Sequence, residues 1–155
     1  MKALRFLFLT AFVFAAPSVA APQYTANHQI EIDQVWARIA PNEADTVSVF
    51  FQIYNAADKP DVLIGAASPA AESVVLRRGI WKGLNFLNTV VKDISVRARK
   101  TMVLRPGVYE VTLNKLNAPV KVGAVLPLTL TFRDAGPISV DVPVTNQLLG
   151  NRGQK

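Results

Sequence analysis

The chain has 155 residues, no cysteine, a formal net charge of +6 and a hydrophobic fraction of 50%. The lack of cysteine in this sequence predicts no disulfide, no thiolate ligand or nucleophile, and no lipidated cysteine. The basic excess is modest, so we expect it to favour solubility rather than nucleic-acid binding.

An export signal is predicted at the start of the chain. Lys2 and Arg5 precede an apolar run over residues 6–16, and small residues follow up to Ala20. Such a pattern is typical of a cleaved secretory signal, and the run is shorter than the roughly 20 apolar residues of a spanning helix. We therefore predict a signal peptide over residues 1–20 and a periplasmic mature chain without a membrane span.

Short segments of alternating apolar and polar residues follow, separated by turns rich in Gly, Pro, Asn and Asp. After a mobile lead-in over 21–27, the alternation predicts strands over residues 28–38, 45–54, 61–67, 73–77, 86–91, 94–96, 101–104, 109–113, 126–132 and 137–144. Many short strands without an amphipathic helix indicate an antiparallel β-sandwich. We place one domain at 28–145 and a flexible tail at 146–155.

Two segments single out candidate functional residues. In the strand 109–113, the alternation places Tyr109, Val111 and Leu113 inward, with Glu110 and Thr112 outward. Residues 78–85 show no clean period, so we expect a loop there. Its basic and aromatic cluster, Arg77, Arg78, Trp81 and Lys82, is either a solvated face or a docking site for an acidic partner.

Catalytic motifs are missing from the sequence. The chain has a single histidine, His28, and it has no Gly-x-Ser-x-Gly elbow or phosphate-binding glycine loop. No pair of carboxylates is marked as an acid and base couple. We therefore predict that the protein is not an enzyme.

Six segments in order give the chain a resemblance to the periplasmic PCu(A)C copper chaperone family. They are Val35-Trp36-Ala37-Arg38, Phe51-Gln52-Ile53-Tyr54-Asn55, Ala66 to Glu72, Val103-Leu104-Arg105-Pro106-Gly107, Leu126 to Phe132, and Val140 to Val144. The resemblance implies an all-β fold, a cupredoxin-like antiparallel Greek-key β-sandwich in a single domain. It also implies copper delivery to a membrane oxidase.

The copper ligands of that family do not carry over. The resemblance implies a His, ten residues, a Met, twenty-one residues and then His-x-Met; on this chain those positions fall on Arg77, Asn88, Glu110 and Thr112. Cu(I) prefers soft thioether and imidazole donors, and these four offer a cation and hard oxygens. We predict no copper at these positions, and instead an ion pair between Arg77 and Glu110 supported by Asn88 and Thr112.

Two functions remain open at this point. The first is a non-catalytic accessory or interaction protein without a cofactor, whose partner is a periplasmic or membrane protein such as a copper oxidase or its assembly factors. The alternative is a copper-binding protein that delivers Cu to a membrane oxidase through weak, non-standard or partner-shared ligands. For that alternative, His28 and Met102 are the available ligands, although we expect Met102 to fill the core.

Overall fold

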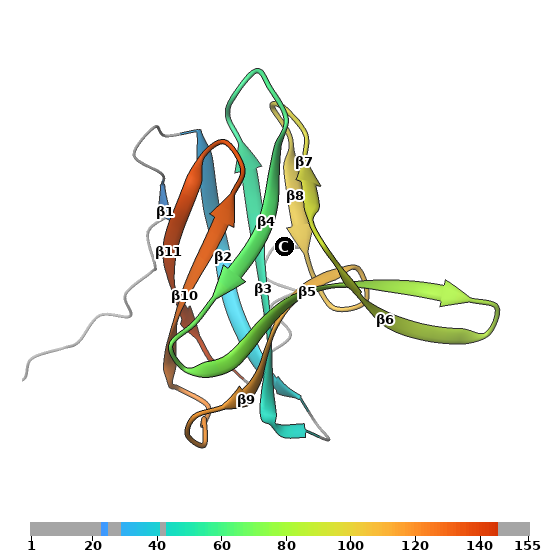
Figure 1. Ribbon diagram of the computed structural model, residues 1–155, viewed down its shortest axis with the longest axis vertical. Helices are drawn as coiled ribbons and strands as arrows, with labels where there is room; N and C mark the ends of the chain where they lie inside the picture. The colour runs from blue at the N-terminus through green and yellow to red at the C-terminus, as the bar shows by residue number, and fades with distance from the viewer. Residues whose placement is uncertain (1–22, 25–28, 41–42, 146–155) are drawn as a thin grey trace, which may run out of the picture.

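The computed structural model describes residues 23–24, 29–40 and 43–145 (Figure 1). This part of the chain forms eleven strands and contains no helix, hence none long and apolar enough to cross a membrane. The strands are β1 (Gln23–Tyr24), β2 (Ile30–Ala40), β3 (Glu43–Asn55), β4 (Asp61–Ala67), β5 (Ala71–Lys82), β6 (Asn85–Val91), β7 (Ile94–Val96), β8 (Thr101–Leu104), β9 (Tyr109–Leu116), β10 (Val125–Phe132) and β11 (Gly136–Pro143).

Two antiparallel sheets face one another in a sandwich (Figure 1). The larger sheet has the order β1-β2-β3-β9-β5-β6, with β8 also paired to β3, and the smaller sheet has the order β11-β10-β4-β7. The all-β cupredoxin-like sandwich expected from the sequence is therefore confirmed. Pro143 lies at the end of β11, an edge strand, where its missing N–H donor removes no interior ladder bond.

The core lies between the sheets and is made by the inward half of each alternating strand. In β10, Leu126, Leu128, Leu130 and Phe132 are all buried, whereas Val125 and Pro127 are exposed. A bulge in β2 between Asp33 and Trp36 changes which residues face this core. Ile30 and Ile32 face it before the bulge and Ala37 after it, so Trp36 turns to the outer face of the larger sheet.

Several strands are longer than predicted. β3 extends beyond both predicted ends and β9 continues to Leu116, whereas β2 is shifted and runs on to Ala40. Within the predicted lead-in, Gln23–Tyr24 form β1 against β2 rather than irregular chain. The predicted signal peptide, His28 and the tail 146–155 lie outside the described residues.

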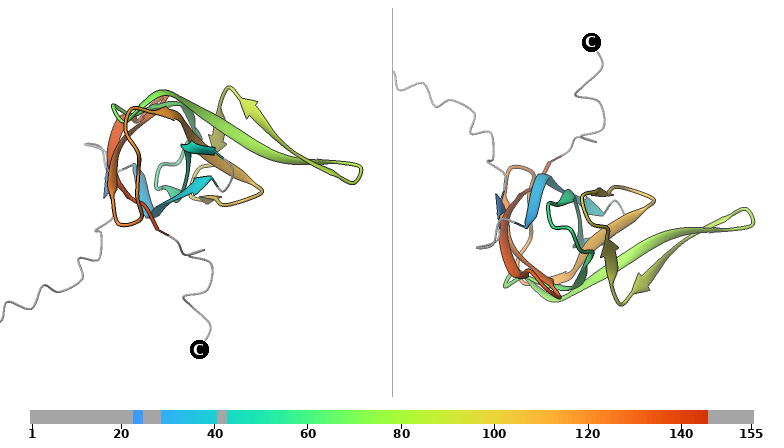
Figure 2. Two further views of the ribbon diagram at one scale, coloured as in Figure 1. Left: turned by 90° about the horizontal axis from the view of Figure 1, so that it is seen from below. Right: turned by 90° about the horizontal axis from the view of Figure 1, so that it is seen from above.

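The predicted loop at 78–85 is wrong, because these residues complete a β-hairpin. β5 runs on to Lys82 and pairs with β6 from Asn85, which leaves Gly83 and Leu84 as a two-residue turn. Gly83 has a φ of 63°, a conformation that favours glycine at the first position of such turns. The hairpin projects away from the sandwich in every view (Figures 1 and 2).

Candidate functional site

Three strands bring the four positions of interest together on the outer face of the larger sheet. Arg77 on β5 lies directly opposite Glu110 on β9, and Thr112 follows two residues later on the same face. Asn88 on β6 reaches the same place, because its side-chain amide donates a hydrogen bond to the Glu110 carboxylate. The Thr112 hydroxyl also donates to Oε1 of Glu110, at 3.4 Å. We call Asn88, Glu110 and Thr112 the Glu110 cluster.

Glu110 and Thr112 face away from the core between the sheets, as the alternation predicts, but they are buried. Glu110 is 9% exposed and Thr112 is 3% exposed. The reason is that β9 is an interior strand between β3 and β5, and the outer face of β3 is also packed. Ser48, the β3 partner of Thr112, is buried, and Phe50 on the same face is fully buried.

An aromatic pair continues this packed face toward β2. The rings of Trp36 and Phe50 lie 4.6 Å apart between centroids, and the guanidinium of Arg38 lies 5.9 Å from the Phe50 ring centroid. The bulge in β2 places Trp36 and Arg38 there. The outer face of the sheet is therefore packed next to the Glu110 cluster, and the Glu110 carboxylate has little access to water.

The predicted ion pair between Arg77 and Glu110 is not formed. Among the described residues, the ion pairs are Arg99 with Asp58 and Lys115 with Glu72. The Nε atom of Arg77 is buried without a hydrogen-bond partner, although Arg77 faces Glu110 across the strands. The Asn88 amide and the Thr112 hydroxyl occupy the Glu110 oxygen that a bidentate ion pair would need.

Met102, the candidate ligand that the structure describes, does not join the cluster. Met102 on β8 lies opposite Ile53 and packs against the core, as predicted. His28 lies outside the described residues, and the described part of the chain has no group of three His, Cys, Asp or Glu side chains placed to hold a metal ion. The donors gathered at the site are a carboxylate, an amide and a hydroxyl, beside a guanidinium.

The basic and aromatic residues fall on the hairpin rather than in a loop. Trp81 is 72% exposed, and its ring contacts Phe86 across the strands at 5.3 Å between centroids. Arg78 lies on the other face, with its guanidinium 5.7 Å from the Tyr109 ring centroid. The sequence signal that we missed is Lys82-Gly83-Leu84-Asn85, a two-residue turn between segments rich in aromatic and aliphatic residues.

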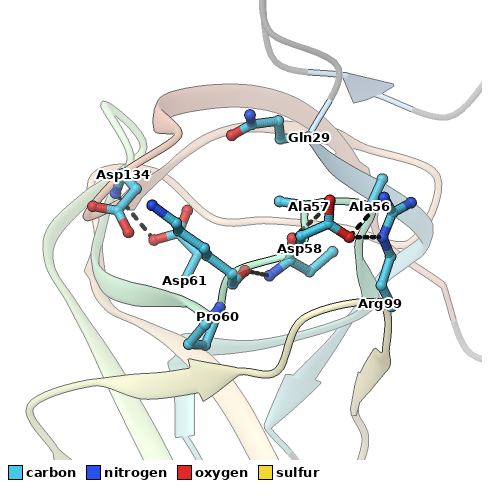
Figure 3. A pocket seen from close by; sticks show the side chains of 10 residues that line it. Gln29, Ala56, Ala57, Asp58, Pro60, Asp61, Arg99 and Asp134 are labelled. Carbon is cyan, nitrogen blue, oxygen red and sulfur yellow. Dashed lines mark hydrogen bonds and ion pairs between the residues drawn. The ribbon is translucent and has the colours of Figure 1, made fainter.

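A separate pocket lies where β3, β4 and the β7–β8 connection meet (Figure 3). Its buried polar side chains are satisfied internally: Asn55 bonds to the backbone of Ala57, Lys59 and Val96, and Asp61 accepts backbone N–H groups of residues 62, 134 and 135. Asn55 and Asp61 therefore fix the ends of strands.

An exposed ion pair closes one side of this pocket. The Arg99 Nε donates to Asp58 Oδ1 at 2.9 Å. This hydrogen bond and the positive charge of Arg99 hold the pKa of the Asp58 carboxyl below its usual value, and Asp58 raises the pKa of Arg99. Both groups are in water, where such a pair contributes little to stability.

Comparison with known proteins gives consistent matches. A family model described as LpqE-like putative lipoprotein matches residues 30–144. The putative lipoprotein Lxx21020 of Leifsonia xyli subsp. xyli is 26% identical over 127 residues, which cover 81% of this chain and 75% of the relative.

Solved structures show the same fold. The copper-bound PCuAC domain from PmoF2 superposes with a TM-score of 0.68 at 23% identity, covering 81% of this chain and 98% of that domain. The Cu(I) form of DR1885 from Deinococcus radiodurans gives a TM-score of 0.61 at 26% identity, covering 76% of this chain and 78% of DR1885. Both of those structures contain copper, and this chain shares their fold.

Proposed function

This chain belongs to the LpqE-like family of putative lipoproteins and has the PCuAC fold, and from that premise we propose that it is an exported, non-catalytic accessory or interaction protein that has lost the copper site of its fold. The observation that carries the proposal is the Glu110 cluster. Asn88 and Thr112 donate to the Glu110 carboxylate at the positions where the resembled family has copper ligands. Side-chain hydrogen bonds stand there in place of metal bonds.

The chemistry of the cluster disfavours Cu(I). Soft thioether and imidazole donors suit that ion, whereas an amide, a hydroxyl and a carboxylate suit hard cations. The carboxylate is already used as an acceptor, and the Arg77 cation is its direct neighbour on β5. A copper ion would have to break the hydrogen bonds of a nearly buried carboxylate and approach a positive charge.

We propose that the protein acts in the periplasm after cleavage of residues 1–20. Its partner, in this proposal, is a periplasmic or membrane protein, with a copper oxidase or its assembly factors as the first candidates. The hairpin that carries Arg77, Arg78, Trp81 and Lys82 projects from the sandwich and is available for contact.

Cu(I) competition against a chromophoric chelator tests the loss of the site. We expect the chain from Ala21 onward to leave the copper with the chelator, because its cluster offers no soft donor. Stoichiometric removal of copper from the chelator would overturn the proposal. If that removal disappeared in His28→Ala or Met102→Ala, the result would identify that residue as a copper ligand and would favour the alternative function, copper delivery through non-standard ligands.

A further inference from the structure

The β5–β6 hairpin concentrates the exposed apolar surface of the molecule. Among the residues that the structure describes, six of the eleven exposed large hydrophobic side chains lie within residues 80–90. Leu84 at the turn is 98% exposed and Trp81 is 72% exposed. The other four are Ile80, Phe86, Leu87 and Val90. A cluster of this kind on a projecting element is typical of an interaction site.

The apolar groups lie on both faces of the hairpin and at its tip. The register pairs Ile80 with Leu87 on one face and Trp81 with Phe86 on the other, with Leu84 between the strands at the turn. A flat protein surface would cover only one of these faces. The interfacial region of a bilayer surrounds an inserted tip on every side, and Trp has a marked preference for that region.

The paired part of the hairpin carries charge of one sign. From Leu76 to Val91 the sequence contains three basic residues, Arg77, Arg78 and Lys82, and no acidic residue. Lys82 adjoins the apolar turn, where its ammonium can meet lipid phosphates while Leu84 enters the apolar region. This arrangement complements an anionic membrane surface.

The base of the hairpin is held in place by the loop before β9. The Gly79 N–H donates to the Val108 carbonyl at 2.9 Å. A side chain at Gly79 would collide with the backbone of Gly107 and the ring of Phe86, so the strands and the loop meet there in close contact. The base of the hairpin is therefore held against the rest of the domain, and the tip extends from it.

We propose that the tip of this hairpin, residues 80–87, inserts into the interfacial region of an anionic phospholipid bilayer. The inference rests on the proposed role of the chain as an interaction protein, and it names the surface that the hairpin contacts. It does not depend on the copper site, because lipid binding by the hairpin is measured in the absence of copper. A failure of either one can therefore be recognised separately.

Tryptophan fluorescence with vesicles tests this insertion. The sequence has two tryptophans; Trp36 is 7% exposed, so a change on lipid addition reports on Trp81. With phosphatidylglycerol–phosphatidylcholine vesicles we expect a blue shift and co-sedimentation of the chain from Ala21 onward, both weakened by salt. Pure phosphatidylcholine vesicles should bind much less.

Three hairpin variants, with control substitutions elsewhere on the molecule, make the test specific. Leu84→Ser and Lys82→Gln should each weaken binding to the anionic vesicles, and Trp81→Ser with Leu84→Ser should weaken it on the order of 10-fold or more. Val122→Ser and Val125→Ser replace exposed valines elsewhere on the molecule and should leave binding unchanged. Unchanged binding in the Trp81 and Leu84 double variant would overturn the proposal. Absence of a blue shift with both kinds of vesicle would also overturn it, leaving an acidic protein as the ligand of the hairpin.

Discussion

Replacing Arg77 by His, Asn88 by Met, Glu110 by His and Thr112 by Met is expected to give the chain a Cu(I) site, with about one copper bound per chain in competition with a chelator. The structure already brings the four positions together. Arg77 and Glu110 are direct cross-strand neighbours, and Asn88 and Thr112 both reach the Glu110 carboxylate. Soft ligands would therefore converge where hard ones now do.

Two further variants serve as controls for this experiment. Thr112 is nearly buried, and a larger Met at that site can cost about 1–3 kcal/mol through overpacking, so the triple variant that keeps Thr112 is measured as well. Arg78→His with Thr89→Met places one His and one Met on the opposite face of the hairpin, away from positions 110 and 112, and should bind no copper. A folded quadruple variant and a folded triple variant that both fail to bind would show that the four positions do not form one site.

Asn55→Ala is expected to lower the free energy of unfolding by about 3 kcal/mol. Asn55 has no exposed surface, and its amide donates to the carbonyls of Lys59 and Val96 at 2.9 and 3.2 Å. Its side-chain oxygen accepts from the backbone N–H of Ala57 at 2.9 Å. Truncation removes these three bonds and leaves buried backbone groups without partners, so the urea midpoint should fall at an unchanged slope.

Asn117→Ala is the matched control for this prediction. Asn117 also donates to a carbonyl, that of Pro69 at 2.8 Å, but it does so at the surface. Water can replace that bond, and we expect a change within about 0.5 kcal/mol. Equal losses in the two variants would mean that the bonds of Asn55 do not fasten β3 to β7.

The positions of the strands could be predicted because their alternation is regular. The bounds predicted for residues 61–67, 94–96 and 101–104 are those of β4, β7 and β8. The hairpin was missed because Ile80 and Trp81 are adjacent apolar residues on opposite faces, so the segment has no period of two. Its turn chemistry, with glycine first, was the remaining local signal.

The site was predictable in its location and only partly in its bonding. The spacing of Arg77, Asn88, Glu110 and Thr112 identified residues that do lie together. The alternation placed Glu110 and Thr112 on the outer face correctly, but a strand pattern cannot show that both faces of an interior strand are packed. Nor can it rank acceptor geometry, which gives the Glu110 oxygen to Asn88 and Thr112 rather than to Arg77.

Two-dimensional NMR of the chain from Ala21 onward, with and without stoichiometric Cu(I), tests most directly whether hydrogen bonds have replaced the metal. The side-chain amide of Asn88 and the backbone amides of Glu110 and Thr112 report on the cluster. We predict that their resonances stay in place when Cu(I) is added, because the carboxylate remains bonded to Asn88 and Thr112. Shifts or broadening confined to those three residues would show that copper binds at the cluster, and would contradict the loss of the site.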